Sequence, residues 1–175
     1  YLNKISKKKK FKKFIIGSDK SSFYILKIQK IGEQKKVDFS FNNRKYSFKT
    51  SLIGNLQIKN LTFAIIAAYL SNIRIEKILQ TINKIKPING RLEKIGSLKN
   101  NAVVILDYAH TPDALKLSIL NIKEDFPNSR VSIVFGCGGN RDKNKRGIMG
   151  KIADKYCDYI YLTDDNPRNE NPRTI

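Results

Sequence analysis

Hydrophobic and polar positions follow a short alternating pattern in the first part of the chain. Apolar residues alternate at Phe23 and Ile25, again after a turn near Gly32 at Val37, Phe39 and Phe41, and after Asn42-Asn43 at Tyr46 and Phe48. A period of two is typical of half-buried strands, and paired asparagines favour tight turns. This stretch therefore predicts a β-meander with an Asn-Asn turn.

Helical spacing replaces the alternation after Gly54. Two apolar stripes follow with intervals mostly of three or four residues: Leu61, Ile65, Ala68 and Tyr69, and then Ile75, Ile78, Leu79 and Ile82. Residues at these intervals share one face of a helix. We therefore expect two helices that are separated near Asn72.

Helix-breaking residues end this helical region. Pro87 lacks a backbone N–H, and Asn89 and Gly90 follow it closely. We place the domain boundary here, so that residues 1–88 belong to one domain and residues 89–175 to the next.

Beyond that boundary the pattern predicts strand, helix, strand, helix, strand. The continuous apolar run at 102–106 is typical of a strand buried on both faces of a parallel sheet, a second buried strand is expected at 131–135, and a third strand at 159–162. This alternation predicts an α/β fold with a doubly wound sheet and right-handed crossovers.

Two helices are expected between these strands. The first begins at Thr111-Pro112-Asp113, because threonine is a good N-cap, proline suits the first helical position and aspartate favours the positive end of the helix dipole. It ends before Pro127. The second is expected over 148–156.

Composition narrows the function classes. With 175 residues and 41% hydrophobic content the chain can form a packed core, and two cysteines without a CxxC pair exclude a disulfide scaffold and a zinc ribbon. No apolar run approaches the ~18 residues of a membrane span and no signal peptide is visible, so we expect a cytoplasmic protein. The chain lacks an initiator methionine, which suggests a piece of a longer protein.

The net charge of +19 raises the hypothesis of a nucleic-acid partner. The excess of basic over acidic residues is +12 in residues 1–50, +6 in 51–100 and only +1 in 101–175. A nucleic-acid binder would be expected to interleave aromatic or amide side chains with its basic residues, whereas Lys7 to Lys10, Lys12 and Lys13 form a nearly pure lysine run that is typical of a solvated loop. We expect no nucleic-acid partner, although a basic binding module without chemistry stays an alternative.

Polar residues follow each of the three expected strands of the second half. These segments are Asp107-Tyr108-Ala109-His110, Gly136-Cys137-Gly138-Gly139-Asn140-Arg141-Asp142 and Thr163-Asp164-Asp165-Asn166-Pro167-Arg168. Ligands bind beyond the carboxyl ends of parallel strands, so we expect the three loops to form one pocket for an anionic or zwitterionic ligand.

Simpler interpretations exist for the individual residues. Asp107 could cap a turn, His110 could make a polar contact at a helix start, and the glycines of 136–139 could serve only a tight turn. No GxGxxG or GxxxxGK[ST] motif occurs, so the chain carries no phosphate loop of its own. Cys137 and Cys157 suit packing positions.

Together these segments resemble the Mur ligase family, in particular its MurE type. The strings that carry the resemblance are Asn89 to Glu93, Asp107 to Asp113, Phe135 to Lys143 and Asp165 to Arg168, with weaker similarity over Gly54 to Ala68. The resemblance implies that residues 1–88 end a central ATP-binding domain and that 89–175 begin a Rossmann-like C-terminal domain that binds the amino acid.

The implied activity is ATP-dependent amide-bond formation in peptidoglycan synthesis. Such an enzyme activates UDP-N-acetylmuramoyl-L-alanyl-D-glutamate as an acyl phosphate and joins it to meso-diaminopimelate, with ATP and Mg²⁺. By resemblance, Asn60, Arg91 and Asp107 would bind ATP, and His110 near the triphosphate is the only catalytic candidate. Arg141, Asp165, Asn166, Pro167 and Arg168 would bind the amino acid.

Departures from the family pattern limit what is carried over. Asn140 stands where aspartate is usual, and Leu56-Gln57 replaces the common Phe-Asn. The family's phosphate loop, its magnesium-organising lysine and a Gly-x-Gly-His-Glu segment would lie outside this chain. We therefore expect no metal ligand here, an inactive isolated piece and a monomeric full-length enzyme. Another Mur or folylpolyglutamate-type ligase stays an alternative.

Overall fold

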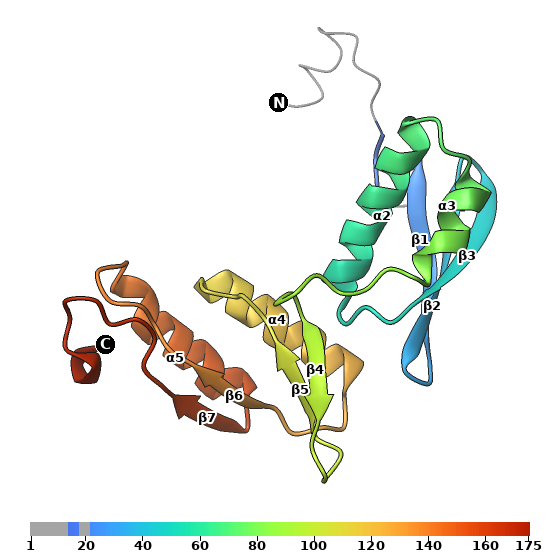
Figure 1. Ribbon diagram of the computed structural model, residues 1–175. Coiled ribbons are helices and arrows are strands. Elements are labelled where there is room, and N and C mark those ends of the chain that lie inside the picture. The colour runs from blue at the N-terminus through green and yellow to red at the C-terminus, as the bar shows by residue number, and fades with distance from the viewer. Residues whose placement is uncertain (1–13, 18–21) are drawn as a thin grey trace, which may run out of the picture. The chain divides into compact units, whose positions relative to one another are not determined.

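A computed structural model describes residues 14–17 and 22–175 and divides into two compact units (Figure 1). The first unit comprises the described residues up to Leu52 together with Gln57–Lys86, and the second comprises Ile53–Leu56 and Pro87–Ile175. The Lys7–Lys13 run lies outside the described residues.

The first unit is a three-stranded antiparallel meander with two helices. Its elements are β1 (Phe23–Ile31), β2 (Gln34–Phe41), β3 (Arg44–Thr50), α2 (Asn55–Leu70) and α3 (Ile75–Ile82). Asn42 and Asn43 join β2 to β3 with φ angles of 48° and 61°. Two consecutive positive φ angles are what a tight hairpin turn requires, so the expected meander and its Asn-Asn turn are confirmed. The break between the helices falls at Asn72, also with positive φ.

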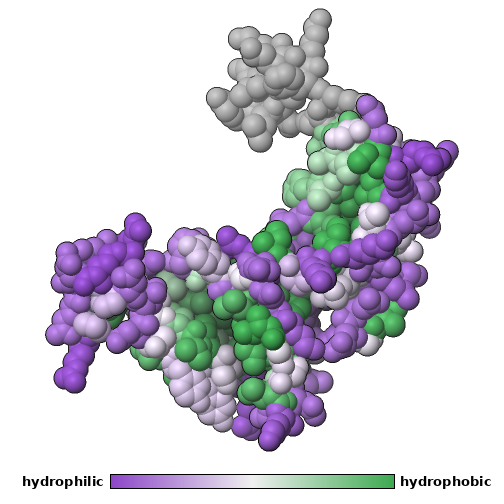
Figure 2. All heavy atoms as spheres, viewed as in Figure 1, coloured by the Kyte–Doolittle hydropathy of each residue, from purple (hydrophilic) through white to green (hydrophobic). Residues whose placement is uncertain are grey.

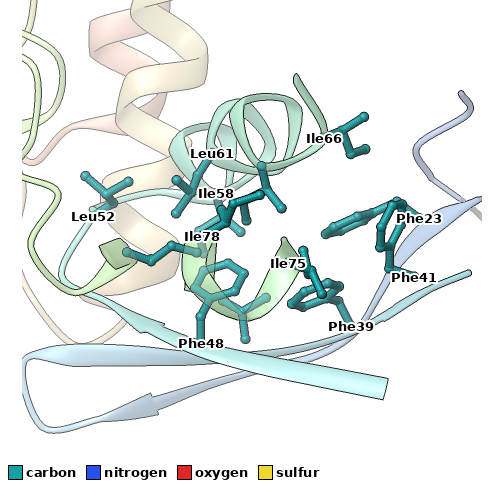
Figure 3. Packing of buried hydrophobic residues seen from close by; sticks show 13 residues of the cluster. Phe23, Phe39, Phe41, Phe48, Leu52, Ile58, Leu61, Ile66, Ile75 and Ile78 are labelled. Carbon is teal, nitrogen blue, oxygen red and sulfur yellow. The ribbon is translucent and has the colours of Figure 1, made fainter. Parts of the chain in front are cut away.

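Aromatic side chains of the sheet and aliphatic side chains of the helices form the core of this unit (Figure 3). Phe23 and Phe39 are fully buried and stack with their ring centroids 4.5 Å apart. The apolar stripes of α2 and α3 pack on this sheet face through Ile58, Leu61, Ile65, Ile66, Ile75, Ile78 and Ile82. The helical periodicity read from the sequence therefore marks the buried faces.

The second unit contains two separate strand pairs and two long helices. Its elements are β4 (Glu93–Ser97), β5 (Val103–Leu106), α4 (Pro112–Asp125), β6 (Ser132–Phe135), α5 (Asn144–Tyr156), β7 (Tyr159–Leu162) and the 3-10 turn η1 (Pro172–Thr174). β4 pairs with β5 antiparallel, and β6 pairs with β7 parallel. Leu115 and Ile119 of α4 pack with Met149 of α5, so the two helices lie against each other.

Several features of this unit differ from the sequence-based expectations. In the described residues β5 pairs only with β4, a strand that the pattern did not predict, and not with β6. α5 begins at Asn144 rather than at 148. The expectation of a strand buried on both faces is wrong for β6, because Val134 is 68% exposed, and Leu162 of β7 is 73% exposed as well. Figure 2 shows green, hydrophobic atoms on the surface over the strands of this unit.

The contact between α4 and α5 explains this exposure. Ile133 and Phe135 of β6 pack against the buried residues of α4 and α5, and alternate side chains of a strand point to opposite faces. Val134 lies between these two residues, faces away from the helices and is exposed.

Local capping sets where two helices begin. Thr111 accepts a hydrogen bond from the backbone N–H of Ala114, as expected for the N-cap of α4. The start of α2 is held by α4, because Asp125 accepts from the N–H of Gly54 at 2.8 Å and Asn121 accepts from that of Leu56 at 3.1 Å. These buried polar side chains satisfy backbone donors that a helix start leaves unpaired. They account for the grouping of Ile53–Leu56 with the second unit.

Candidate functional site

The loops that follow β5, β6 and β7 surround one hollow of about 580 Å³. Six of the residues singled out in the sequence line it: Asp107, His110, Arg141, Asp165, Asn166 and Arg168. Pro167 lines a neighbouring hollow of about 440 Å³ that shares Asp165 with the first. The expected convergence of three loops is therefore present although β5 and β6 are not paired.

Asp107 anchors the first loop through both carboxylate oxygens. Oδ1 accepts hydrogen bonds from the Ala109 N–H at 2.9 Å and from the Ser118 hydroxyl at 2.8 Å. Oδ2 accepts from the N–H of Leu92, which has a φ of 46°. Non-glycine residues rarely adopt such an angle, so the carboxylate fixes an unusual backbone conformation. A carboxylate offers about four lone-pair positions, which leaves Asp107 one for a ligand.

Arg91, Tyr108 and His110 form a stacked group beside Asp107. The Arg91 guanidinium carbon lies 5.1 Å from the Tyr108 ring centroid, and the rings of Tyr108 and His110 meet edge to face at 5.2 Å. His110 Nδ1 lies 3.0 Å from the Tyr108 carbonyl. A carbonyl can only accept, so Nδ1 donates, and in the neutral ring Nε2 is left as an acceptor. Lys145 donates to the His110 carbonyl at 2.8 Å and adds a positive charge to this edge.

The second and third loops approach each other so closely that only glycine fits between them. A Cβ on Gly139 would lie 1.8 Å from the Pro167 carbonyl oxygen, and one on Gly136 would lie 2.2 Å from that of Thr163. The Gly139 N–H donates to the Asn166 carbonyl at 3.1 Å. The glycines therefore permit packing between loops, which goes beyond the tight turn considered from the sequence.

Arg168 and Arg141 both line the hollow, but only Arg168 is hydrogen-bonded to the neighbouring loop. Arg168 donates from Nη1 to the Gly139 carbonyl at 2.6 Å. Its Nε and Nη2 donate no hydrogen bond within the described residues, so the parallel pair of N–H groups that suits a carboxylate is open. Arg141 is exposed and makes no ion pair or hydrogen bond in the described part of the chain. Both guanidiniums can therefore meet a charged ligand.

A partly buried ion pair connects these loops to α5. Arg146 of α5 donates from both Nη atoms to the two carboxylate oxygens of Glu170, at 2.9 and 3.0 Å. The Asn140 N–H donates to the same carboxylate at 2.5 Å. The hydrogen bonds from Arg146 and Asn140 lower the pKa of Glu170 from 4.5 to about 2. Neither Arg146 nor Glu170 was singled out in the sequence.

The sequence also predicts a nucleotide site and the absence of metal ligands. Asn60 lies exposed on α2 in the first unit, and Arg91 and Asp107 lie in the second. Among residues 14–17 and 22–175 no group of three or more His, Cys, Asp or Glu side chains could hold a metal ion. No described helix is long and apolar enough to cross a membrane.

Comparison with known proteins identifies the family. Residues 90–175 match the model of the Mur ligase, glutamate ligase domain. A curated relative from Rickettsia felis, named UDP-N-acetylmuramoyl-L-alanyl-D-glutamate--2,6-diaminopimelate ligase, is 42% identical over 164 residues, which is 93% of this chain and 30% of the relative. The chain belongs to the Mur ligase family.

Other Mur ligases support the same placement. A ligase of the same name from Blochmanniella floridana is 40% identical over 149 residues, covering 80% of this chain and 30% of its own length. The chain thus spans about a third of the length of the curated Mur ligases that it matches.

Solved Mur ligase structures confirm the α/β fold. A structure with the same diaminopimelate ligase name has a TM-score of 0.62 and 29% identity, and the match covers 90% of this chain and 32% of that one. The UDP-N-acetylmuramate-alanine ligase of Thermotoga maritima has a TM-score of 0.69 at 19% identity, covering 85% and 33%. Because the sequence identity of this second match is only 19%, it is evidence for a shared fold and not for a shared function.

The residues missed in the sequence had little local signal. Arg146 and Glu170 are 24 positions apart, and each stands among other charged residues. Lys145 belongs to a run of charges at the start of α5. Only the close approach of the loops shows which of these charges meet in this Mur ligase site.

Proposed function

We propose that the protein is an ATP-dependent ligase that joins meso-diaminopimelate to UDP-N-acetylmuramoyl-L-alanyl-D-glutamate in peptidoglycan synthesis, in the cytoplasm and as a monomer. The supporting observation is the hollow where Arg141 and Arg168 meet Asp107 and His110 on three converging loops. The names of relatives that are about 40% identical point to the same reaction.

In this proposal the two units have separate tasks. Residues 1–88 form the end of a central ATP-binding domain, and residues 89–175 form the start of the domain that receives the amino acid. ATP would supply the phosphoryl group that turns the substrate carboxylate into an acyl phosphate. The amino group of diaminopimelate then attacks the acyl carbon, an amide bond forms and phosphate leaves. Magnesium would accompany ATP with ligands outside the described residues.

The residues of this chain would bind and orient the reactants. Asn60, Arg91 and Asp107 would contact ATP, and His110 with its open Nε2 would lie near the triphosphate. The amino acid would be held by Arg141 and by the loop of Asp165, Asn166, Pro167 and Arg168. Asp107 and Arg168 line the same hollow from different loops, so the two reactants would be held beside each other.

Arg168 gives a physical basis for choosing meso-diaminopimelate. This amino acid differs from L-lysine by a second carboxylate on its far carbon, and a guanidinium can bind that carboxylate through two parallel hydrogen bonds. Nη1 of Arg168 is already occupied by the Gly139 carbonyl, so the open Nε and Nη2 would form this pair. Hydrogen bonds to charged groups contribute ~1.5 to 3 kcal/mol each, which corresponds to roughly ten- to hundredfold selection.

The test uses the protein expressed from its complete coding sequence. Phosphate release with the UDP-linked dipeptide is measured with meso-diaminopimelate, L-lysine or L-glutamate as the amino acid. Turnover with meso-diaminopimelate alone supports the proposal, and turnover only with another amino acid refutes it. Arg168→Lys keeps the charge but loses the planar pair of donors, so the KM for diaminopimelate should rise more than that for ATP. Unchanged diaminopimelate kinetics in this variant would remove the assignment of Arg168.

A further inference from the structure

The ion pair between Arg146 and Glu170 connects three parts of the site. Arg146 belongs to α5, and its Nη2 also lies 3.5 Å from the carbonyl oxygen of Gly138 in the loop after β6. Glu170 ends the loop after β7 and accepts from the N–H of Asn140. Lys143 adds a weaker contact to Glu170 at 3.5 Å. The pair therefore fastens both loops to the helix behind them.

Both partners are largely withdrawn from water. The side chains of Arg146 and Glu170 are 11% and 14% exposed. Arg146 Nε is buried and has no hydrogen-bond partner among the described residues, so the guanidinium is held by its two Nη atoms. Loss of one partner would leave the other as an uncompensated charge, which is more damaging inside a protein than at its surface.

The loop that the pair holds has an unusual backbone. Asn166 and Arg168 have φ angles of 21° and 52°, and Pro167 between them has a fixed φ. Non-glycine residues in such conformations persist only when their surroundings hold them. One restraint comes before the arginine, where the Asn166 carbonyl accepts from the Gly139 N–H, and the second comes after it at Glu170.

We infer that Arg146 and Glu170 are positioning residues that hold the Asp165–Arg168 loop so that Arg168 faces the amino acid, and that they thereby set the preference for an amino acid with a carboxylate on its far carbon. This inference rests on the proposed function. Neither residue needs to touch the substrate, because Arg168 lies two positions before Glu170 in the restrained segment and donates a hydrogen bond to the Gly139 carbonyl of the neighbouring loop.

The experiment compares selectivity rather than activity alone. In the protein expressed from its complete coding sequence, kcat/KM is measured for meso-diaminopimelate and for L-lysine, and the ratio of the two is taken. Partial unfolding lowers both values equally and leaves the ratio unchanged. A misplaced Arg168 loses the contact to the far carboxylate, so it lowers the value for diaminopimelate and the ratio with it.

Glu170→Gln keeps the shape of the side chain and removes its charge. We expect the selectivity ratio to fall about tenfold while the KM for ATP stays within about twofold of the wild type. Arg146→Lys, which cannot form the two-point contact, should lower the ratio in the same direction, and it decides the question if the glutamine variant does not fold. Glu76→Gln, the same change at an exposed position on α3, is the matched control and should leave the ratio unchanged.

The outcomes separate this inference from the proposed function. A wild-type enzyme that prefers diaminopimelate, together with an unchanged ratio in Glu170→Gln and Arg146→Lys, would overturn the positioning role and leave the ligase assignment intact. A wild-type enzyme without activity toward diaminopimelate would refute both.

Discussion

Substitution of Gly139 by alanine tests whether the second and third loops form one rigid site. The added Cβ would lie 1.8 Å from the Pro167 carbonyl oxygen and 2.6 Å from its carbonyl carbon, whereas ordinary contacts begin at 3.4 Å. Both neighbours are backbone atoms, so no side-chain rotation can relieve the overlap. The loop that carries Arg168 must therefore move by more than about 1 Å.

A displacement of this size has a predictable cost. Misplacing a binding group by ~1 Å reduces rates by up to ~10²-fold. We therefore expect kcat/KM of the Gly139→Ala ligase for the amino acid to fall about 10²-fold, with a smaller change in the KM for ATP. Steady-state phosphate release at varied diaminopimelate and varied ATP provides both values.

The control is a glycine with free space around it. A Cβ on Gly96, which lies on β4 and away from the hollow, meets nothing within 4 Å. Gly96→Ala should retain wild-type kinetics. If Gly139→Ala also retained wild-type kinetics and melting temperature, the close packing of the two loops would not describe the working site.

Three further predictions concern stability and pH. Phe39→Ala removes a fully buried ring of the first unit and should lower the free energy of unfolding by ~3–5 kcal/mol in urea titrations, whereas an unchanged midpoint would contradict that core. Thr111→Ala removes the N-cap of α4 and should cost ~1 kcal/mol in the same assay, and Thr111→Ser should restore most of it. The pKa of Glu170 is lowered from 4.5 to about 2, so its stabilising effect is complete above pH 4.5 and is lost as the pH falls toward 2. The melting temperature of the wild type should therefore fall more steeply in this range than that of Glu170→Gln, and parallel curves would argue against the ion pair.

Features that depend on a few adjacent residues could be predicted from the sequence. The Asn42-Asn43 turn requires two positive φ angles, which asparagine tolerates, and Thr111-Pro112 combines an N-cap with a residue that needs no N–H partner. Such choices depend on local sterics and hydrogen bonding. The same is true of the two helices whose apolar stripes form the core of the first unit.

Pairing between distant segments could not be predicted in this way. β4 contains Lys94 and Gly96 and lacks an apolar run, and it is a strand because β5 offers it an edge. The residues around Val134 have the apolar pattern of a buried strand, yet Val134 is exposed, because the sequence pattern indicates a preference for burial and not which other segment covers the residue. The sequence indicates Asp107 as a candidate site residue. Its hydrogen bonds from the Leu92 N–H and the Ser118 hydroxyl become visible only in three dimensions.

The large net charge of the chain has little part in the proposed selectivity. The basic excess is +12 in residues 1–50 but +1 in residues 101–175, which supply the three loops. A diffuse positive field would attract any anion and could not distinguish a second carboxylate on an amino acid. Distinction requires a guanidinium at a fixed place, and the site provides it through the Gly139 contact, the anchor at Glu170 and the restrained backbone of Arg168. Selectivity in this Mur ligase should therefore be more sensitive to changes that move Arg168 than to changes in surface charge of the same size.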